Sequence, residues 1–224
     1  MSFYVLFNIL IVFFPFVLSF DKKVGFYKKW KYVFPAISIT AIIYIIWDVL
    51  VTKRGDWWFS AHYTGNFHIL GLPLGEILFF FTVPYACLFI YEVISAYTKE
   101  KLFKIPVYIT PGLGIIFFIV SLFFFNKDYT FLAFFSVSIF LFFSTLFYKE
   151  LFASNHRIFY FVICLIPFLG ANVALTALPV VNYNPLAIIG FRVITIPIED
   201  FFYNISLLGF NLLLYLIFKR KFSP

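Results

Sequence analysis

Seven apolar runs of about 20 residues most strongly constrain how this chain can fold. A helix needs ~20 apolar residues to cross a hydrocarbon core of ~30 Å, and within lipid only helices and closed barrels satisfy every backbone polar group. Hydrophobic residues make up 63% of the chain and charged residues 12%, too little polar surface for a soluble domain. The sequence therefore predicts an all-α integral membrane protein of about seven transmembrane helices, at about 2–20, 32–52, 73–96, 106–125, 129–147, 158–178 and 197–218.

Lys and Arg are distributed unevenly between alternate connections of these predicted spans. Thirteen of the 17 basic residues fall after spans one, three, five and seven. Because such loops face the cytoplasm by the positive-inside rule, we expect a multi-pass protein of the cytoplasmic membrane with its N-terminus outside and its C-terminus inside. The net charge of +7 then reflects orientation and contact with membrane lipids, and no nucleic-acid partner is expected. The remaining four basic residues are Lys53, Arg54, Lys127 and Arg192.

The chain contains an internal repeat at an offset of 124 residues. This offset places 46–76 over 170–200 without a gap and matches Pro73 to Pro197. It also superimposes spans one to three on spans five to seven, which leaves span four as a connector. We therefore expect two tandem parallel three-helix repeats at 1–98 and 129–224, joined through 99–128. Parallel repeats would bring equivalent segments to one depth, facing each other across the bundle.

Besides Glu92, near the end of its span, four acidic residues lie within or at the start of predicted spans: Asp48, Glu76, Glu199 and Asp200. Ionisable groups inside a membrane are costly, so a function in the bundle interior is the default interpretation. A carboxyl group kept from water favours its protonated form and can donate a proton. The structural alternatives are helix capping after the two prolines and, for Asp48, pairing with Lys53 or Arg54. Glu92 is expected to be interfacial.

Motifs for common cofactors are absent from the sequence. No G-x-G-x-x-G follows a strand, and Gly112 and Gly114 lie within a predicted span, so no dinucleotide fold is indicated. His62, His68 and Glu76 have no recognised metal-ligand spacing. No cofactor or metal is evident, although recruitment of a reduced flavin or nicotinamide without a recognisable motif stays open.

Segment 197–203 reads PIEDFFY, and segment 72–80 reads LPLGEILFF. The first is similar to the proline-x-acid-acid-x-x-aromatic signature of the membrane lycopene cyclases, and the second resembles the first copy of that signature. This family is known as paired small subunits in some bacteria and as fused forms in other bacteria, archaea and fungi. Trp47-Asp48 followed by Gly55-x-Trp57 is similar to the stretch before that copy. One departure is Gly75-Glu76, where the family often has two acids. The length is that expected for both halves fused.

The resemblance implies a lycopene β-cyclase that converts lycopene through monocyclic γ-carotene to β-carotene, without redox change. Glu199 or Asp200 is then the expected proton donor, with Glu76 and Asp48 as catalytic partners. Aromatic faces can stabilise the carbocation. Trp57 is also typical of an interfacial aromatic belt, and Asn172, at the position equivalent to Asp48, could bond across helices instead. The expected substrate-binding residues are Phe201, Phe202, Tyr203, Phe79, Phe80, Trp57 and Asn172.

Two other functions remain open from the sequence. A hydratase would add water to the same cation of a carotenoid or isoprenoid end group. A small membrane transporter would also place acids and interrupted helices at an internal repeat, but it predicts polar residues along a whole route across the membrane. The expected partner is the carotenoid itself, taken from the bilayer.

Overall fold

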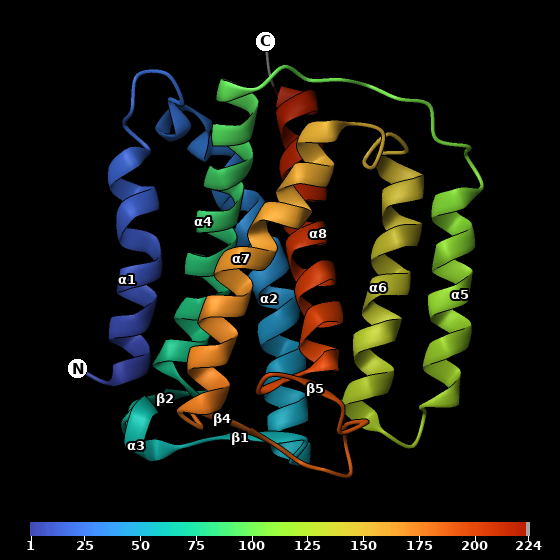
Figure 1. Cartoon of the computed structure of the whole chain (residues 1–224). Helices are drawn as coiled ribbons and strands as arrows, with labels where there is room; N and C mark the ends of the chain where they lie inside the picture. The colour runs from blue at the N-terminus through green and yellow to red at the C-terminus, as the bar shows by residue number, and fades with distance from the viewer. Residues whose placement is uncertain (223–224) are drawn as a thin grey trace.

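A computed structural model of the chain, which describes residues 1–222, contains seven apolar helices side by side (Figure 1). Each of them overlaps one of the seven apolar runs of the sequence. Five are long and apolar enough to cross a membrane, whereas α1 and α5 are apolar but only 16 and 15 residues long. The chain is an all-α membrane protein. The helices are α1 (Phe3–Leu18), α2 (Trp30–Arg54), α4 (Leu74–Tyr97), α5 (Ile109–Phe123), α6 (Asp128–Phe147), α7 (Asn155–Ala177) and α8 (Ile198–Phe222).

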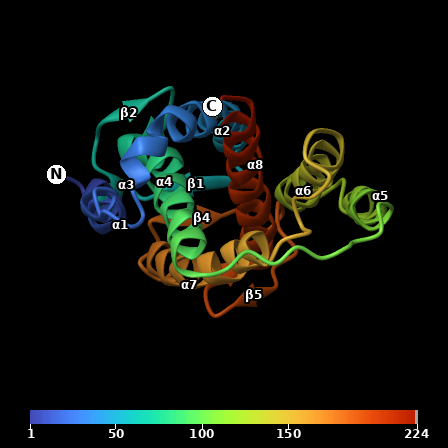
Figure 2. The ribbon, with the colours of Figure 1, turned by 90° about the horizontal axis from the view of Figure 1, so that it is seen from above.

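Helices α4 and α8 form the centre of the bundle (Figure 2). Helices α1 and α7 pack on α4, α2 and α6 pack on α8, and α5 packs on the outside of α6. The central residues Leu88, Phe140, Leu208 and Leu212 are at most 1% exposed. Large apolar side chains such as Phe14 remain exposed on the outer faces, as expected where lipid is the solvent.

The two halves of the chain are built alike and exchange contacts. Helices α1, α2 and α4 lie 124 residues before α6, α7 and α8. Helix α1 packs on α4 as α6 packs on α8, while α2 reaches across to α8 and α7 reaches across to α4. These contacts are those of the tandem parallel repeats expected from the sequence, with the halves interlocked. The boundaries at 98 and 128 stay a prediction.

Each half has a short β-hairpin immediately before its third helix. Strand β2 (His68–Ile69) pairs with β3 (Leu72–Pro73), and β5 (Arg192–Val193) pairs with β6 (Ile196–Pro197), at the same offset of 124. The turns contain Leu70 and Ile194, with φ of 56° and 62°. Because proline fixes φ and lacks an N–H group, it suits a position just before a helix. The hairpins therefore set the starting points of α4 and α8.

A third pair of strands joins the two halves. Strand β1 (Trp57–Phe59) pairs antiparallel with β4 (Val181–Tyr183), and Trp58 lies opposite Asn182. Trp58 and Asn182 are also equivalent positions of the two halves, because they are 124 residues apart. A two-fold axis that passes between β1 and β4 requires this pairing. The short helices η1 (Phe26–Lys29) and α3 (Ala61–Thr64) complete the described elements. None of these strands was expected from the apolar pattern.

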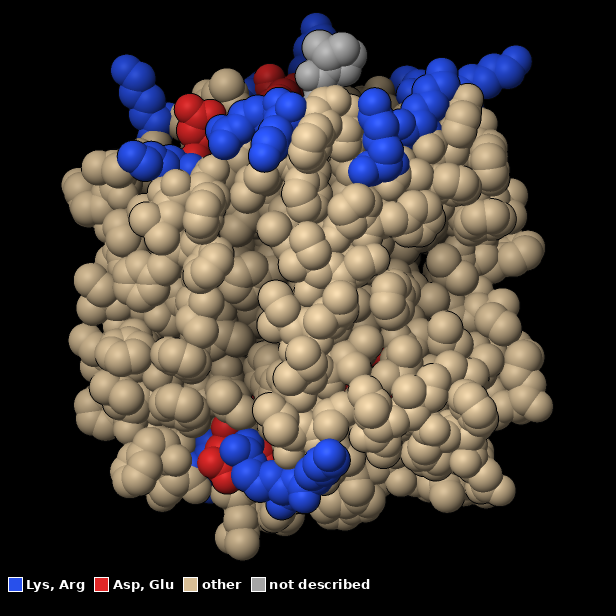
Figure 3. Space-filling model, turned by 180° about the vertical axis from the view of Figure 1, so that it is seen from behind, with Lys and Arg blue, Asp and Glu red and all other residues tan. Residues whose placement is uncertain are grey.

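Basic residues gather at one end of the bundle, here called the basic end (Figure 3). This end contains η1, the α4–α5 and α6–α7 connections and the last turn of α8. Glu92 lies near it, is 1% exposed and pairs with Lys29 and Lys219. Its expected place at the membrane interface stays a prediction. The opposite end, which contains all six strands, is called the strand end.

Candidate functional site

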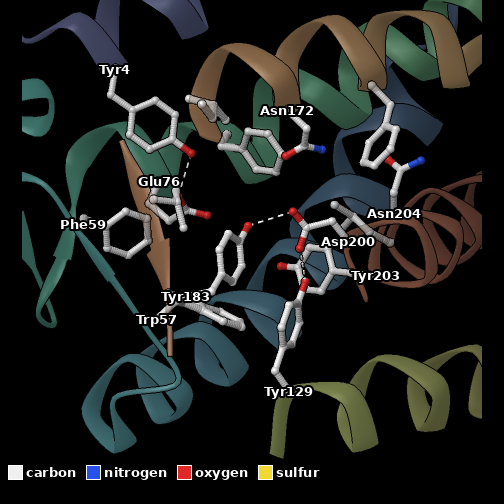
Figure 4. A pocket seen from close by; sticks show the side chains of 15 residues that line it. Tyr4, Trp57, Phe59, Glu76, Tyr129, Asn172, Tyr183, Asp200, Tyr203 and Asn204 are labelled. Atoms are coloured by element: carbon white, nitrogen blue, oxygen red, sulfur yellow. Dashed lines mark hydrogen bonds between the residues drawn. The ribbon is translucent and has the colours of Figure 1, made fainter. Parts of the chain in front are cut away.

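A small cavity of about 60 Å³ lies inside the strand end, between the two halves of the chain (Figure 4). Glu76 reaches it from the first turn of α4 and Asp200 from the first turn of α8. Its walls are mainly aromatic. The other lining residues are Tyr4, Trp57, Phe59, Phe79, Tyr129, Phe168, Asn172, Leu175, Val181, Tyr183, Tyr203, Asn204 and Leu207.

Asp200 is held by two phenols. Tyr129 Oη donates to Oδ1 at 2.6 Å and Tyr183 Oη donates to Oδ2 at 2.7 Å (Figure 4). Burial and the neighbouring Asp200 raise the pKa of the Tyr183 phenol well above its usual value, so this tyrosine of β4 keeps its proton and remains a donor. Because each oxygen accepts one hydrogen bond, the carboxylate form of Asp200 is satisfied and fixed in orientation.

Glu76 is held by the first helix. Tyr4 Oη donates to Glu76 Oε2 at 2.6 Å, and Asn8 Nδ2 donates to the carbonyl oxygen of Gly75 at 2.9 Å. The Tyr4 ring lies where a side chain at residue 75 would be, since a Cβ on Gly75 would come within 2.5 Å of Tyr4 Cγ. Gly75, the departure from the two-acid pattern, therefore makes room for the tyrosine that holds Glu76.

Asp48 lies behind Glu76 on α2 and is 1% exposed. Trp57 Nε1 donates to Asp48 Oδ1 at 2.8 Å, and Thr52 Oγ1 donates to the same oxygen at 3.2 Å. No N–H or hydroxyl group of the described residues bonds Oδ2, but the Glu76 carboxyl lies within hydrogen-bonding reach of Asp48. Two buried carboxyl groups in contact favour holding one proton between them. The alternative pairing of Asp48 with Lys53 or Arg54 is not among the ion pairs of the described residues, and Arg54 pairs with Asp56 instead.

Glu199 is buried but does not line the cavity. Its Oε1 accepts hydrogen bonds from Thr130 Oγ1 at 2.6 Å and from the backbone N–H of Ile189 at 2.7 Å. Neighbouring residues on a helix point about 100° apart, so Glu199 and Asp200 face different surroundings. Glu199 ties the start of α8 to α6 and to the loop before β5.

The expected substrate-binding residues divide into two groups. Tyr203, Phe79, Trp57 and Asn172 line the cavity. The other three pack elsewhere: Phe80 is fully buried near Tyr44, Phe201 lies against Phe168 and Phe202 lies against Phe134.

Several lining residues escaped the sequence analysis. Tyr4 and Tyr129 lie near the beginnings of helices, and Tyr183 lies in a strand. A proline–acid pattern does not point to them, and only Tyr183 has an equivalent aromatic residue in the other half that also lines the cavity, Phe59. The feature that these three residues share is a tyrosine side chain at the strand end of the bundle.

The arrangement suits proton transfer to an apolar molecule. Glu76, with Asp48 behind it, and the phenol-bound Asp200 face a space walled by aromatic rings, which can stabilise positive charge. Tyr203 is itself braced by Trp47 and Tyr44, with ring centroids 5.0 and 5.2 Å away. The described residues contain no group of three or more His, Cys, Asp and Glu placed to hold a metal ion.

Comparison with known proteins shows a match to a protein family. Residues 1–94 and 126–218 match the family model described as lycopene cyclase. The two matched segments contain the two sets of three helices and omit α5. No curated protein and no solved structure matches. The family model covers most of the chain, including every residue that lines the cavity, and the chain therefore belongs to the lycopene cyclase family.

Proposed function

We propose that this enzyme is a lycopene β-cyclase, which converts each acyclic end of lycopene to a β-ring through γ-carotene and without redox change. The observation that carries the proposal is that Glu76 and Asp200, from equivalent positions in the two halves, face one aromatic cavity. Cyclisation needs one group to give a proton and one to take a proton, and this cavity presents one carboxyl on each side.

The chemistry is balanced by two proton transfers. A proton adds to the terminal double bond of the carotenoid, and the carbocation that results accepts the electron pair of a second double bond, which closes the ring. The new cation then loses a proton from the neighbouring ring carbon. One proton is gained and one is lost, so the product is an isomer of the substrate and needs no external oxidant or reductant.

The hydrogen bonds favour a division of roles different from the one expected from sequence. Asp200 accepts two phenol hydrogen bonds, which stabilise its carboxylate and suit a proton acceptor. Glu76 lies in contact with Asp48, and a carboxyl pair that shares a proton suits the donor. We therefore propose that Glu76 with Asp48 supplies the proton and that Asp200 removes it. Glu199 positions α8.

Aromatic side chains supply the remaining requirement, stabilisation of the carbocation. The rings of Tyr203, Phe79 and Trp57 line the cavity between the two acids. An aromatic face attracts a cation by about 2 kcal/mol or more where water is excluded. These rings replace the expected contribution of Phe201 and Phe202, which do not line the cavity.

We propose that the basic end faces the cytoplasm, so that the N-terminus and the cavity lie toward the outer surface of the cytoplasmic membrane. The asymmetry of Lys and Arg supports this orientation (Figure 3). A fluorescent protein that folds only in the cytoplasm, fused to the C-terminus, is expected to fluoresce, and the same fusion at the N-terminus is expected to stay dark. The reverse result would contradict the orientation.

Product analysis tests the proposed reaction. The chain is expressed in a bacterial host that accumulates lycopene. The pigments are separated by chromatography, and their masses are measured by mass spectrometry. We expect yellow cyclic products with the mass of lycopene. A hydroxylated acyclic product heavier by one water would show a hydratase instead, and unchanged lycopene beside folded protein would contradict both reactions.

A further inference from the structure

A second cavity, of about 190 Å³, lies beside the acid site between α1, α4 and α7. Helices α1 and α7 both pack on α4 and flank it in the bundle (Figures 1 and 2). The part of the cavity away from the acids is lined by apolar residues from these three helices, among them Ile11, Pro15, Val83, Ala86, Ile90 and Pro167. We call this cavity the α1–α7 groove.

The α1–α7 groove adjoins the acid site. Four residues line both cavities: Phe79 from α4, Phe168 and Asn172 from α7, and Asn204 from α8. Asn172 and Asn204 are labelled beside Asp200 in Figure 4. A molecule whose end lies between Glu76 and Asp200 can therefore extend past the two amides and into the groove.

The lining of the groove fits a hydrocarbon chain. Apart from the two amides at the junction and the thiols of Cys87 and Cys164, its side chains are purely hydrocarbon, and no charged residue lines it. On α4 it extends from Phe79 to Ile90, about 16 Å along a helix axis at 1.5 Å per residue. The groove is therefore long and narrow rather than round.

Two small residues of the groove are partly exposed. Ala86 on α4 and Ala171 on α7 line it and are only partly buried, although both lie within membrane-crossing helices. Small side chains that are partly exposed leave space that a bulkier residue would fill. A long apolar molecule in the bilayer can enter between α1 and α7 without crossing a polar surface.

We propose that the α1–α7 groove binds the acyclic polyene chain of the carotenoid, so that the end group is held between Glu76 and Asp200. This assignment rests on the proposed function. A larger apolar cavity of about 580 Å³ between α2, α6 and α8 shares no lining residue with the acid site. The packed rings of Trp47 and Tyr203 stand between them. Unlike this larger cavity, the groove borders the acid site.

Filling the groove tests the proposal. In the lycopene-accumulating host, Ala86→Phe and Ala171→Phe are expected to lower cyclic product per folded protein about tenfold or more, because the ring takes space that the chain needs. The matched control is Ala174→Phe, on the same helix as Ala171 but lining neither cavity. It is expected to stay within about twofold of the parent. Unchanged product from folded Ala86→Phe and Ala171→Phe would overturn the proposal.

A smaller change keeps the test informative if the Phe variants do not fold. Ala86→Cys adds only a thiol. Its rate of labelling by a membrane-permeant maleimide is measured after subtraction of the labelling of the parent chain. Labelling is expected to be slower in membranes that contain lycopene than in membranes without it, whereas Ala174→Cys labels equally in both. Equal labelling of Ala86→Cys in the two membranes would contradict occupancy by the carotenoid.

A binding measurement separates this proposal from the proposed function. Lycopene that co-purifies with the protein in mild detergent is quantified for the parent, Ala171→Phe and Ala174→Phe. If the parent makes no cyclic product yet retains lycopene, and only Ala171→Phe loses it, the proposed reaction fails while the groove assignment stands. If the parent cyclises lycopene but Ala171→Phe retains and converts as much, the groove assignment fails while the reaction stands.

Discussion

Glu76 and Asp200 lie 124 residues apart in the sequence and face one cavity, each three residues after the proline that precedes its helix. Their surroundings differ, however. Asp200 is bonded by Tyr129 and Tyr183, and Glu76 is bonded by Tyr4 and lies against Asp48. The two equivalent positions therefore have different hydrogen-bond partners. Such a difference allows one carboxyl group to donate a proton and the other to accept one.

Tyr183→Phe is expected to lower cyclic product per folded protein about tenfold, because it removes one of the two hydrogen bonds that orient and stabilise the Asp200 carboxylate. Pigment chromatography from the lycopene-accumulating host measures the effect. The control is Tyr160→Phe, which removes a buried phenol bonded to the carbonyl oxygen of Leu208, outside the cavity. A Tyr183→Phe rate equal to that of the parent would show that the phenol has no part in the reaction.

Glu199→Gln is expected to keep the rate within about threefold of the parent. The amide oxygen can accept the same hydrogen bonds from Thr130 and from the N–H of Ile189, and Oε2 has no partner among the described residues to lose. Glu199→Ala removes both bonds and is expected to reduce the amount of folded protein. A loss of activity in folded Glu199→Gln as deep as that of Asp200→Asn would place Glu199 in the chemistry.

Gly75→Ala is expected to lower both the thermal midpoint in detergent and the rate, because the new Cβ would displace the Tyr4 ring that holds Glu76. Gly112→Ala on α5 provides the control. A Cβ there would meet no atom within 4 Å, and alanine is the better helix former, so its midpoint is expected to be unchanged or higher. Equal behaviour of the two variants would mean that Tyr4 is not confined by Gly75.

Glu92→Gln is expected to destabilise the protein by about 2 kcal/mol, because it removes the charge that Lys29 and Lys219 bind from both sides. Thermal unfolding in detergent measures this, and the rate per folded protein is expected to stay unchanged because Glu92 lies near the basic end. The exposed Glu150 forms no ion pair among the described residues, so Glu150→Gln should leave the midpoint unchanged. An equal midpoint for the two variants would contradict a structural role for Glu92.

The helices and their arrangement could largely be predicted from the sequence. Lipid forces apolar runs into helices, so each run became one helix, and the shared proline–acid spacing revealed the repeat that brings Glu76 and Asp200 together. The hairpins and the β1–β4 pair were missed because they contain two or three residues each, too few to show a period of two.

The partners of the acids were harder to predict. Tyr4 and Tyr129 reach the cavity through contacts between helices distant in sequence, and no spacing rule connects them with Glu76 or Asp200. The position of Glu199 depends on the rotation of α8, which the loop before β5 fixes by its bond from Ile189. The same rotation of α8 keeps Phe201 and Phe202 out of the cavity lining. Local sequence identifies the acidic turn, but tertiary packing decides which acid faces the substrate.

The most direct test of the central claim is cyclisation of lycopene in heavy water by the parent and by the variants Glu76→Gln and Asp200→Asn. The products are separated by chromatography, and their masses are measured by mass spectrometry. We expect the parent to add one deuteron for each ring formed, and each variant to lose about 100-fold or more of the product when normalised to folded protein. Cyclic products without deuterium, or parental rates in both variants, would contradict proton transfer between these two acids.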